Sequence, residues 1–123
     1  MAKWQNDSML DAALSYISTN LAEMVVCSAQ PTTYAEATST YALADVAVTS
    51  ANVTGPANGS VSGRKITIDE QTGVTVDATG TATHVALVSA DTLLYVDTCT
   101  SQSLTSGTTI TIPAWDIEIR DAA

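Results

Sequence analysis

Apolar residues recur at two different spacings along this chain. In the stretch NDSMLDAALSYISTNLA they return every three to four positions, which predicts an amphipathic helix. Ser8 is suited to cap this helix, and Asp11 follows three positions later, as in a capping box. We expect the apolar face to pack on the rest of the domain or on a neighbouring subunit. This face consists of Met9, Leu10, Ala13, Leu14, Ile17 and Leu21.

From residue 64 onward apolar and polar residues alternate, which predicts half-buried β-strands. Glycine and aspartate turns separate the runs at spacings of about 8–12 residues, as in an antiparallel sandwich or a small barrel. The runs THVALVS and TLLYVDT are joined by a short turn at 89–91, which predicts a hairpin. The predicted strands are 64–68, 73–77, 83–89, 92–98, 108–112 and 115–120.

The pattern between the helix and these strands is mixed. The apolar run EMVVCS predicts a buried strand that ends before Pro31. We expect a short helical turn at 34–38 and a weaker strand at 44–49. The segment 50–63 is rich in Gly, Pro, Asn and Ser, which predicts a flexible, exposed loop.

These elements predict a mainly β fold, an antiparallel β-sandwich or small barrel preceded by one N-terminal amphipathic helix. The predicted division is an N-terminal arm and helix over residues 1–22 and a β domain over residues 23–123. A chain of 123 residues is long enough for one such core. Apolar residues make up 46% of it and charged residues only 14%, so Thr and Ser supply most of the polarity. Threonine is β-branched and suits a half-exposed strand.

Charge excludes one class of partner. Thirteen acidic residues against four basic ones give a net charge of −9, and such a surface repels phosphate backbones. We therefore expect no nucleic-acid partner. The apolar runs are far shorter than the roughly 20 residues that span a bilayer, so we expect no membrane partner either. The start of the chain has no long apolar run, and we expect no secretion signal and synthesis in the cytosol.

The single histidine, His84, is the first candidate for chemistry. Alternation places it on one strand face with Ala86 and Val88, a mainly apolar environment. A metal site or an acid–base pair would need a second histidine or a cysteine at ligand spacing, and no Gly-x-Ser-x-Gly nucleophile motif is present. We expect a packed, hydrogen-bonded histidine, with a pH-sensitive contact as the alternative. The sequence thus predicts no enzyme and no catalytic, cofactor or metal residues.

Acids and cysteines give no stronger signal. Asp69, Glu70 and Asp77 flank a turn without the spacing of an EF-hand loop, so we expect solvated acids rather than a calcium site. Cys27 and Cys99 lie far apart with no C-x-x-C motif. We expect both thiols to be reduced and partly buried. A bond between them remains open if their strands pack together.

Four stretches of the chain resemble small proteins encoded in the structural gene modules of tailed bacteriophages and prophages. They are AKWQNDSMLDAALSYI, MVVCSAQPTTYAEA, GTATHVALVSADTLLYV and TSGTTITIPAWDIEIRD. The THVAL hairpin followed by the closing IPAWDIEI is the most specific part, and it is similar to β-rich modules of phage decoration and fibre proteins. The resemblance implies a non-enzymatic virion component without catalytic residues. It implies foremost a capsid decoration (cement) protein that binds the head exterior in many copies and stabilises it.

The partners expected from this resemblance are the major capsid protein or other virion proteins, and the expected location is the virion. We also expect a homo-oligomer, with a trimer favoured. The candidate interface residues are Met9, Leu10, Leu14 and Ile17, with the segment 50–63 as a second contact. Two alternatives stay open. One is a head-to-tail, tail or fibre-associated subunit with an adhesive role. The other is an enzyme or metal module, which requires a pocket where His84 or a cysteine meets acids.

Overall fold

The structure is a computed structural model, and it describes residues 6–60 and 62–120. It is mainly β, with three antiparallel sheets and one N-terminal α-helix, so the predicted fold class is confirmed. The part of the predicted arm before residue 6 lies outside the described residues. Within the described ranges, no helix combines the length and the apolar character that a membrane span requires.

Helix α1 runs over Asp7–Asn20. The predicted cap is wrong by two residues: the N-cap is Asn6, whose Oδ1 accepts a hydrogen bond from the backbone N–H of Ser8 at 2.8 Å. Both residue types are good caps, and the backbone decides between them, because Asn6 is extended whereas Ser8 is already helical. At the other end the chain leaves the helix at Leu21, which is again extended.

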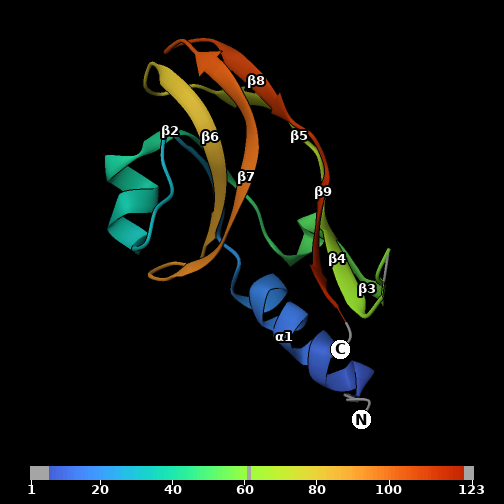
Figure 1. Cartoon of the computed structure of the whole chain (residues 1–123). Helices are drawn as coiled ribbons and strands as arrows, with labels where there is room; N and C mark the ends of the chain where they lie inside the picture. The colour runs from blue at the N-terminus through green and yellow to red at the C-terminus, as the bar shows by residue number, and fades with distance from the viewer. Residues whose placement is uncertain (1–5, 61, 121–123) are drawn as a thin grey trace.

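The largest sheet has four strands in the order β2-β1-β6-β7 (Figure 1). Strands β6 and β7 form the predicted hairpin, in which the Ser89 N–H donates to the Thr92 carbonyl at 2.8 Å. Strand β7 continues six residues past its predicted end at Thr98, because its backbone stays paired with β6 as far as Gly80 and Leu104. The bounds are Ala42–Ala47 for β2, Glu23–Cys27 for β1, Gly80–Val88 for β6 and Leu93–Leu104 for β7.

Two smaller sheets lie opposite this layer (Figure 1). One has the order β3-β4-β9 and the other is the pair β5-β8. A single bridge between Ala44 of β2 and Val76 joins the β5-β8 pair to the four-stranded sheet. The bounds are Val53–Asn58 for β3, Arg64–Ile68 for β4, Gln71–Thr75 for β5, Thr109–Ile112 for β8 and Trp115–Ile119 for β9.

The segment 50–63 is not a loop throughout, which corrects the prediction. It contains a 3-10 turn, η2, over Ser50–Asn52 and then the edge strand β3. The register between β3 and β4 shifts between Thr54 and Ala57, so Gly55 and Pro56 lie outside the regular ladder. Proline is tolerated at such a place because an edge strand does not need every N–H group.

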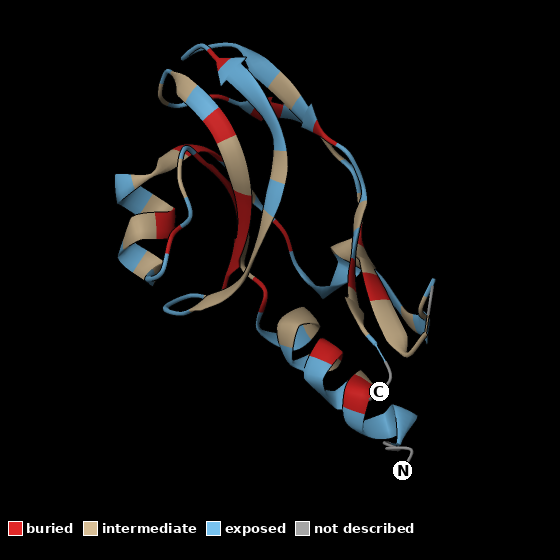
Figure 2. Ribbon diagram, viewed as in Figure 1, coloured by how far each residue is buried: buried red, intermediate tan, exposed pale blue. Residues whose placement is uncertain are grey.

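Both faces of the four-stranded sheet are covered (Figure 2). The inner face contributes Met24 and Leu87 to the main core, where they join Leu14 of α1 and residues of the smaller sheets. The outer face lies under a π-helical turn, η1, over Glu36–Thr40, where Ala37 packs with a second cluster. Because the sheet is covered on both faces, the strand sequences MVVC and VALV are continuously apolar rather than alternating. The second cluster consists of Val25, Cys27, Ala37, Ala86 and Val88.

An ion pair fixes α1 to the sheet. The Arg64 guanidinium at the start of β4 donates from Nε to Asp11 Oδ1 at 2.7 Å and from Nη2 to Oδ2 at 3.4 Å. Its Nη1 donates to Asn58 Oδ1 at 2.8 Å, so the same side chain also holds the end of β3. Both partners of the ion pair are largely shielded from solvent, with 19% and 32% of the side chains exposed. The helix is therefore held in one orientation on β4.

Candidate functional site

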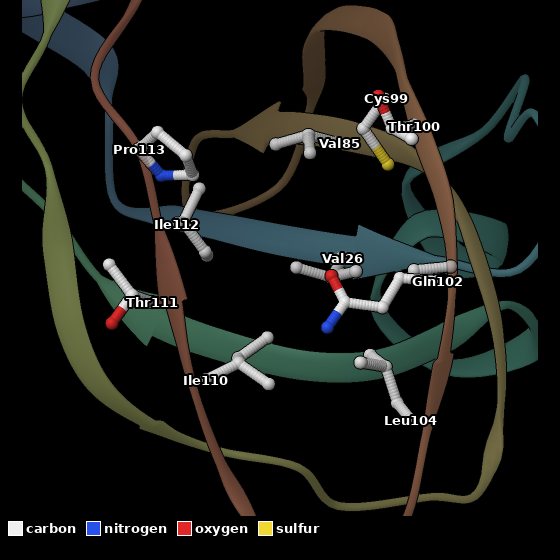
Figure 3. Close-up of a pocket in the computed structure, with 11 residues that line it drawn as sticks. Val26, Val85, Cys99, Thr100, Gln102, Leu104, Ile110, Thr111, Ile112 and Pro113 are labelled. Carbon is white, nitrogen blue, oxygen red and sulfur yellow. The ribbon is translucent and has the colours of Figure 1, made fainter.

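A pocket of about 220 Å³ opens between the second half of β7 and strand β8 (Figure 3). The two strands belong to different sheets and are each the last strand of their sheet on this side. Aliphatic side chains form most of the wall, and Thr100, Gln102 and Thr111 supply the polar atoms. The residues that line the pocket are Val26, Ala82, Val85, Cys99, Thr100, Gln102, Leu104, Ile110, Thr111, Ile112 and Pro113.

The wall on the β7 side is exposed and uncharged. Residues 100–103 of β7 are exposed, and their side chains carry only hydroxyl and amide groups. The Gln102 side chain points from β7 into the space among the lining residues (Figure 3). An edge strand of this kind offers backbone N–H and C=O groups to an extended partner segment.

Cys99 is the titratable side chain in the pocket wall. Burial raises the pKa of its thiol above the ordinary value, and the nearby Asp97 carboxylate raises that pKa further. The thiol is therefore neutral at physiological pH, whereas a nucleophile or a metal ligand must be a thiolate. The pocket is suited to an uncharged, largely apolar group, and its residues do not assemble an acid–base pair.

The two cysteines belong to different apolar clusters, although Cys99 lies near enough to add to the raised pKa of the Cys27 thiol. Cys27 lies in the outer cluster beneath η1, whereas Cys99 packs against the main core on the inner face. Both are free thiols. Because a disulfide requires Cβ atoms within about 4.5 Å that point toward one another, this placement disfavours a bond between them.

His84 is brought beside Cys27, not beside Cys99. The two residues are register partners on β6 and β1, and His84 is half-buried. Its Nδ1 shares a hydrogen bond with the Thr83 hydroxyl at 2.8 Å. The Cys27 thiol makes long contacts to the carbonyl oxygens of Ala37 and Val25. Burial raises the pKa of this thiol to about 11, so the thiol stays protonated at neutral pH. The two residue types are those of a cysteine–histidine catalytic dyad, but the activated thiolate that such a dyad needs is missing.

The two thiols are expected to react at very different rates in the native protein. Cys27 is fully buried, and with a pKa of about 11 only about one thiol in a thousand is ionised at pH 8. Cys99 is partly exposed at the pocket, so a maleimide should modify it first, more slowly than a free cysteine. Mass spectrometry of the wild type and of Cys99→Ser checks this order. Rapid labelling of Cys27 in native Cys99→Ser protein would contradict the burial of Cys27 under η1.

The three acids considered for calcium do not converge. Asp69 accepts a hydrogen bond from the Thr54 hydroxyl at 3.0 Å, whereas Asp77 faces Asp45 of β2. Across residues 6–60 and 62–120, no group of three or more His, Cys, Asp or Glu side chains is placed to hold a metal ion. Asp77 instead marks the junction of two sheets, because its backbone N–H donates to the Leu43 carbonyl at 2.7 Å.

The facing carboxylates of Asp45 and Asp77 make this junction sensitive to pH. A hydrogen bond that protonated Asp77 donates to the Asp45 carboxylate, followed by burial and the charge of Asp45, raises the pKa of Asp77. Because the pKa of Asp77 is higher in the folded state than in the unfolded state, protonated Asp77 stabilises the fold. This contribution is fully present below the unfolded-state pKa of about 3.9, and it is lost as the pH rises through the folded-state pKa of Asp77.

Asp77→Asn is therefore expected to raise the Tm at pH 7, and the gain should vanish near pH 3. Thermal unfolding of both proteins at the two pH values measures this difference. Asp69→Asn is the matched control, since it removes one carboxylate that is held by a threonine hydroxyl. An equal rise in Tm for Asp69→Asn at pH 7 would show that the lower total negative charge, and not the loss of the Asp45–Asp77 repulsion, causes the stabilisation.

The candidate interface residues on α1 fall into two groups. Leu10 and Leu14 are buried at 6% and 0% exposure, and Ile17 is half-buried against the main core. Met9 is 59% exposed. Three of the four side chains therefore already pack within the chain, and Met9 is the one that faces outward. The sequence pattern grouped Met9 with Leu10, although successive helical residues point about 100° apart.

No family model, curated protein or solved structure matches this chain.

Proposed function

We propose that the chain is a non-enzymatic structural protein of a tailed-bacteriophage virion, and that it acts as a capsid decoration protein. It binds the head exterior in many copies and stabilises the particle. The observation that carries the proposal is the kind of surface the fold leaves accessible. The uncharged surfaces that stay exposed are the outer face of α1 and the edge of β7. Near them, Asp11 is held by Arg64, and burial raises the pKa of the Cys99 thiol.

A small domain of this kind is suited to a repeating lattice. Each copy offers a small contact area, and many copies held on one lattice gain from effective concentration. Uncharged contact surfaces on a chain of net charge −9 allow dense packing, because the acidic residues can remain in solvent while neutral surfaces touch. The well-filled core and the helix fixed by Arg64 and Asp11 make the domain rigid, so little ordering entropy is lost on binding.

The pocket between β7 and β8 favours a second candidate, a tail or fibre-associated subunit with an adhesive role. Its apolar wall, with hydroxyl and amide groups at the mouth, is the composition of a site for an uncharged ligand group. An adhesive protein would use this pocket toward a receptor, whereas a decoration protein would use its surfaces toward the capsid.

Co-sedimentation with undecorated capsids tests the first proposal. The purified chain should pellet with capsids to a saturating, repeated stoichiometry, and it should raise the temperature at which the capsids disrupt. Capsids already covered by their own decoration protein are the control, and they should take up much less. A chain that remains in the supernatant with capsids but pellets with purified tails would overturn decoration in favour of the adhesive role.

A further inference from the structure

Helix α1 carries two apolar faces, and the body of the protein covers only one of them. Leu10, Leu14 and Ile17 face the core. Met9 and Tyr16 are 59% and 60% exposed, and they are the large hydrophobic side chains that the described residues leave open to solvent. We call the second face the outer stripe, and it consists of Met9, Ala12, Ala13 and Tyr16, all exposed.

The outer stripe is free of charge. By helical geometry its four residues fall within an arc of about 100°, and the two acids of the helix lie on the far side. Asp11 of that pair is held by Arg64 at 2.7 Å. On a chain of net charge −9, this stripe is a place where two copies can meet without bringing carboxylates together. A basic partner protein would gain more from the acidic surface than from this face.

The stripe is also complementary to itself. Its large residues stand at each end and its small ones in the middle, with the order Met9, Ala12, Ala13, Tyr16. If two such helices cross antiparallel about a two-fold axis between Ala12 and Ala13, each methionine faces the partner's Tyr16. Alanines then face alanines, which allows close approach of the backbones. Methionine sulfur against an aromatic ring is a favourable contact of about 0.3–1.5 kcal/mol.

We propose that the outer stripe of α1 is an isologous docking surface for α1 of a second copy of this chain. An isologous contact requires a patch that matches itself under a two-fold rotation, and this stripe has that property. Its area falls well short of the roughly 800 Å² per partner of a stable interface, so the pairing is weak and reversible. The paired state is well populated only where copies are held close together, because their effective concentration is then high. The inference does not depend on the proposed virion role, because it concerns the chain alone.

Sedimentation velocity of the purified chain over a wide concentration range tests the pairing. The mass should rise toward two copies at high concentration, and Tyr16→Glu should weaken the association at least tenfold. Thr105→Glu is the matched control, because Thr105 is exposed, the substitution adds the same charge, and the turn between β7 and β8 lies away from α1 (Figure 1). Equal weakening by both variants, a mass that stays at one copy, or a trimer that survives Tyr16→Glu would overturn the proposal.

Cross-linking tests the antiparallel register. In a Cys99→Ser background, Met9→Cys and Tyr16→Cys proteins should form a disulfide-linked dimer when they are mixed under oxidising conditions. Neither should do so alone, because the register separates the two copies of either position by about 10 Å along the axis, beyond disulfide reach. Each mixed dimer keeps one methionine–tyrosine pair. Equal cross-linking of the single proteins would indicate a parallel or random encounter and would refute the register.

Discussion

Leu14→Ala is expected to lower the free energy of unfolding by about 2–5 kcal/mol. Leu14 is fully buried in the main core, in the same cluster as Ile66 and Ile68 of β4, onto which α1 packs. Removing three carbon atoms leaves a cavity between the helix and the sheet. The Arg64–Asp11 ion pair still fixes one side of the helix, which limits how far it can collapse into the space.

Urea denaturation followed by circular dichroism measures this loss. Met9→Ala is the control on the same helix, and it should change stability by no more than about 0.5 kcal/mol because Met9 is mainly exposed. The two variants also separate two roles of the helix. Leu14→Ala should reduce stability at every protein concentration, whereas Met9→Ala should affect only association. A Leu14→Ala protein with wild-type stability would mean that α1 does not pack on β4 as described.

The spacing of apolar residues and the residue types at the turns were sufficient to predict strands β4 and β9 and the β6–β7 hairpin from the sequence. Strand β4 matches its predicted bounds, and β9 ends one residue early. In both, alternate residues such as Ile66 and Ile117 are buried, so the side-chain pattern reports the pleat directly. The β6–β7 hairpin was equally accessible because its turn is short and flanked by apolar strands.

Strand β3 and the second half of β7 could not be predicted in this way. Their side chains are mainly exposed, and residues such as Gly55, Pro56 and Ser101 are typical of loops. These segments are strands because a neighbour pairs with their backbone: β4 pairs with β3, and β6 pairs with β7. Backbone pairing does not require alternating apolar side chains in an exposed edge strand, so the sequence carries no period-two pattern there.

The candidate surfaces depend on contacts between distant segments. The pocket arises because residues 99–104 and 110–113 end two separate sheets side by side, and neither stretch carries a recognisable motif. The placement of His84 beside Cys27 depends on strand register, which the sequence leaves open. The outer stripe is visible as a helical repeat, but only burial shows that Met9 and Tyr16 belong together and that Leu14 does not.

Gly63→Ala is expected to cost about 2–4 kcal/mol of stability, much more than the same change at Gly73. Gly63 has a φ of +72° and Gly73 a φ of +63°, so alanine meets a similar left-handed penalty of about 1–2 kcal/mol at both sites. The surroundings differ. A Cβ atom on Gly63 would collide with the backbone carbonyl of Ile119, whereas a Cβ atom on Gly73 would meet nothing within 4 Å.

The collision at Gly63 involves backbone, which cannot rotate away as a side chain can. Ile119 must shift, and its register partner is Arg64, the residue that also holds Asp11 of α1. Gly63→Ala should therefore loosen the end of β9 and the attachment of the helix together. Hydrogen exchange of both variants would show this as lost protection in β9 and α1 for Gly63→Ala only. Equal losses of stability in the two variants would mean that φ alone sets the cost, and that the close approach of Gly63 to β9 does not hold.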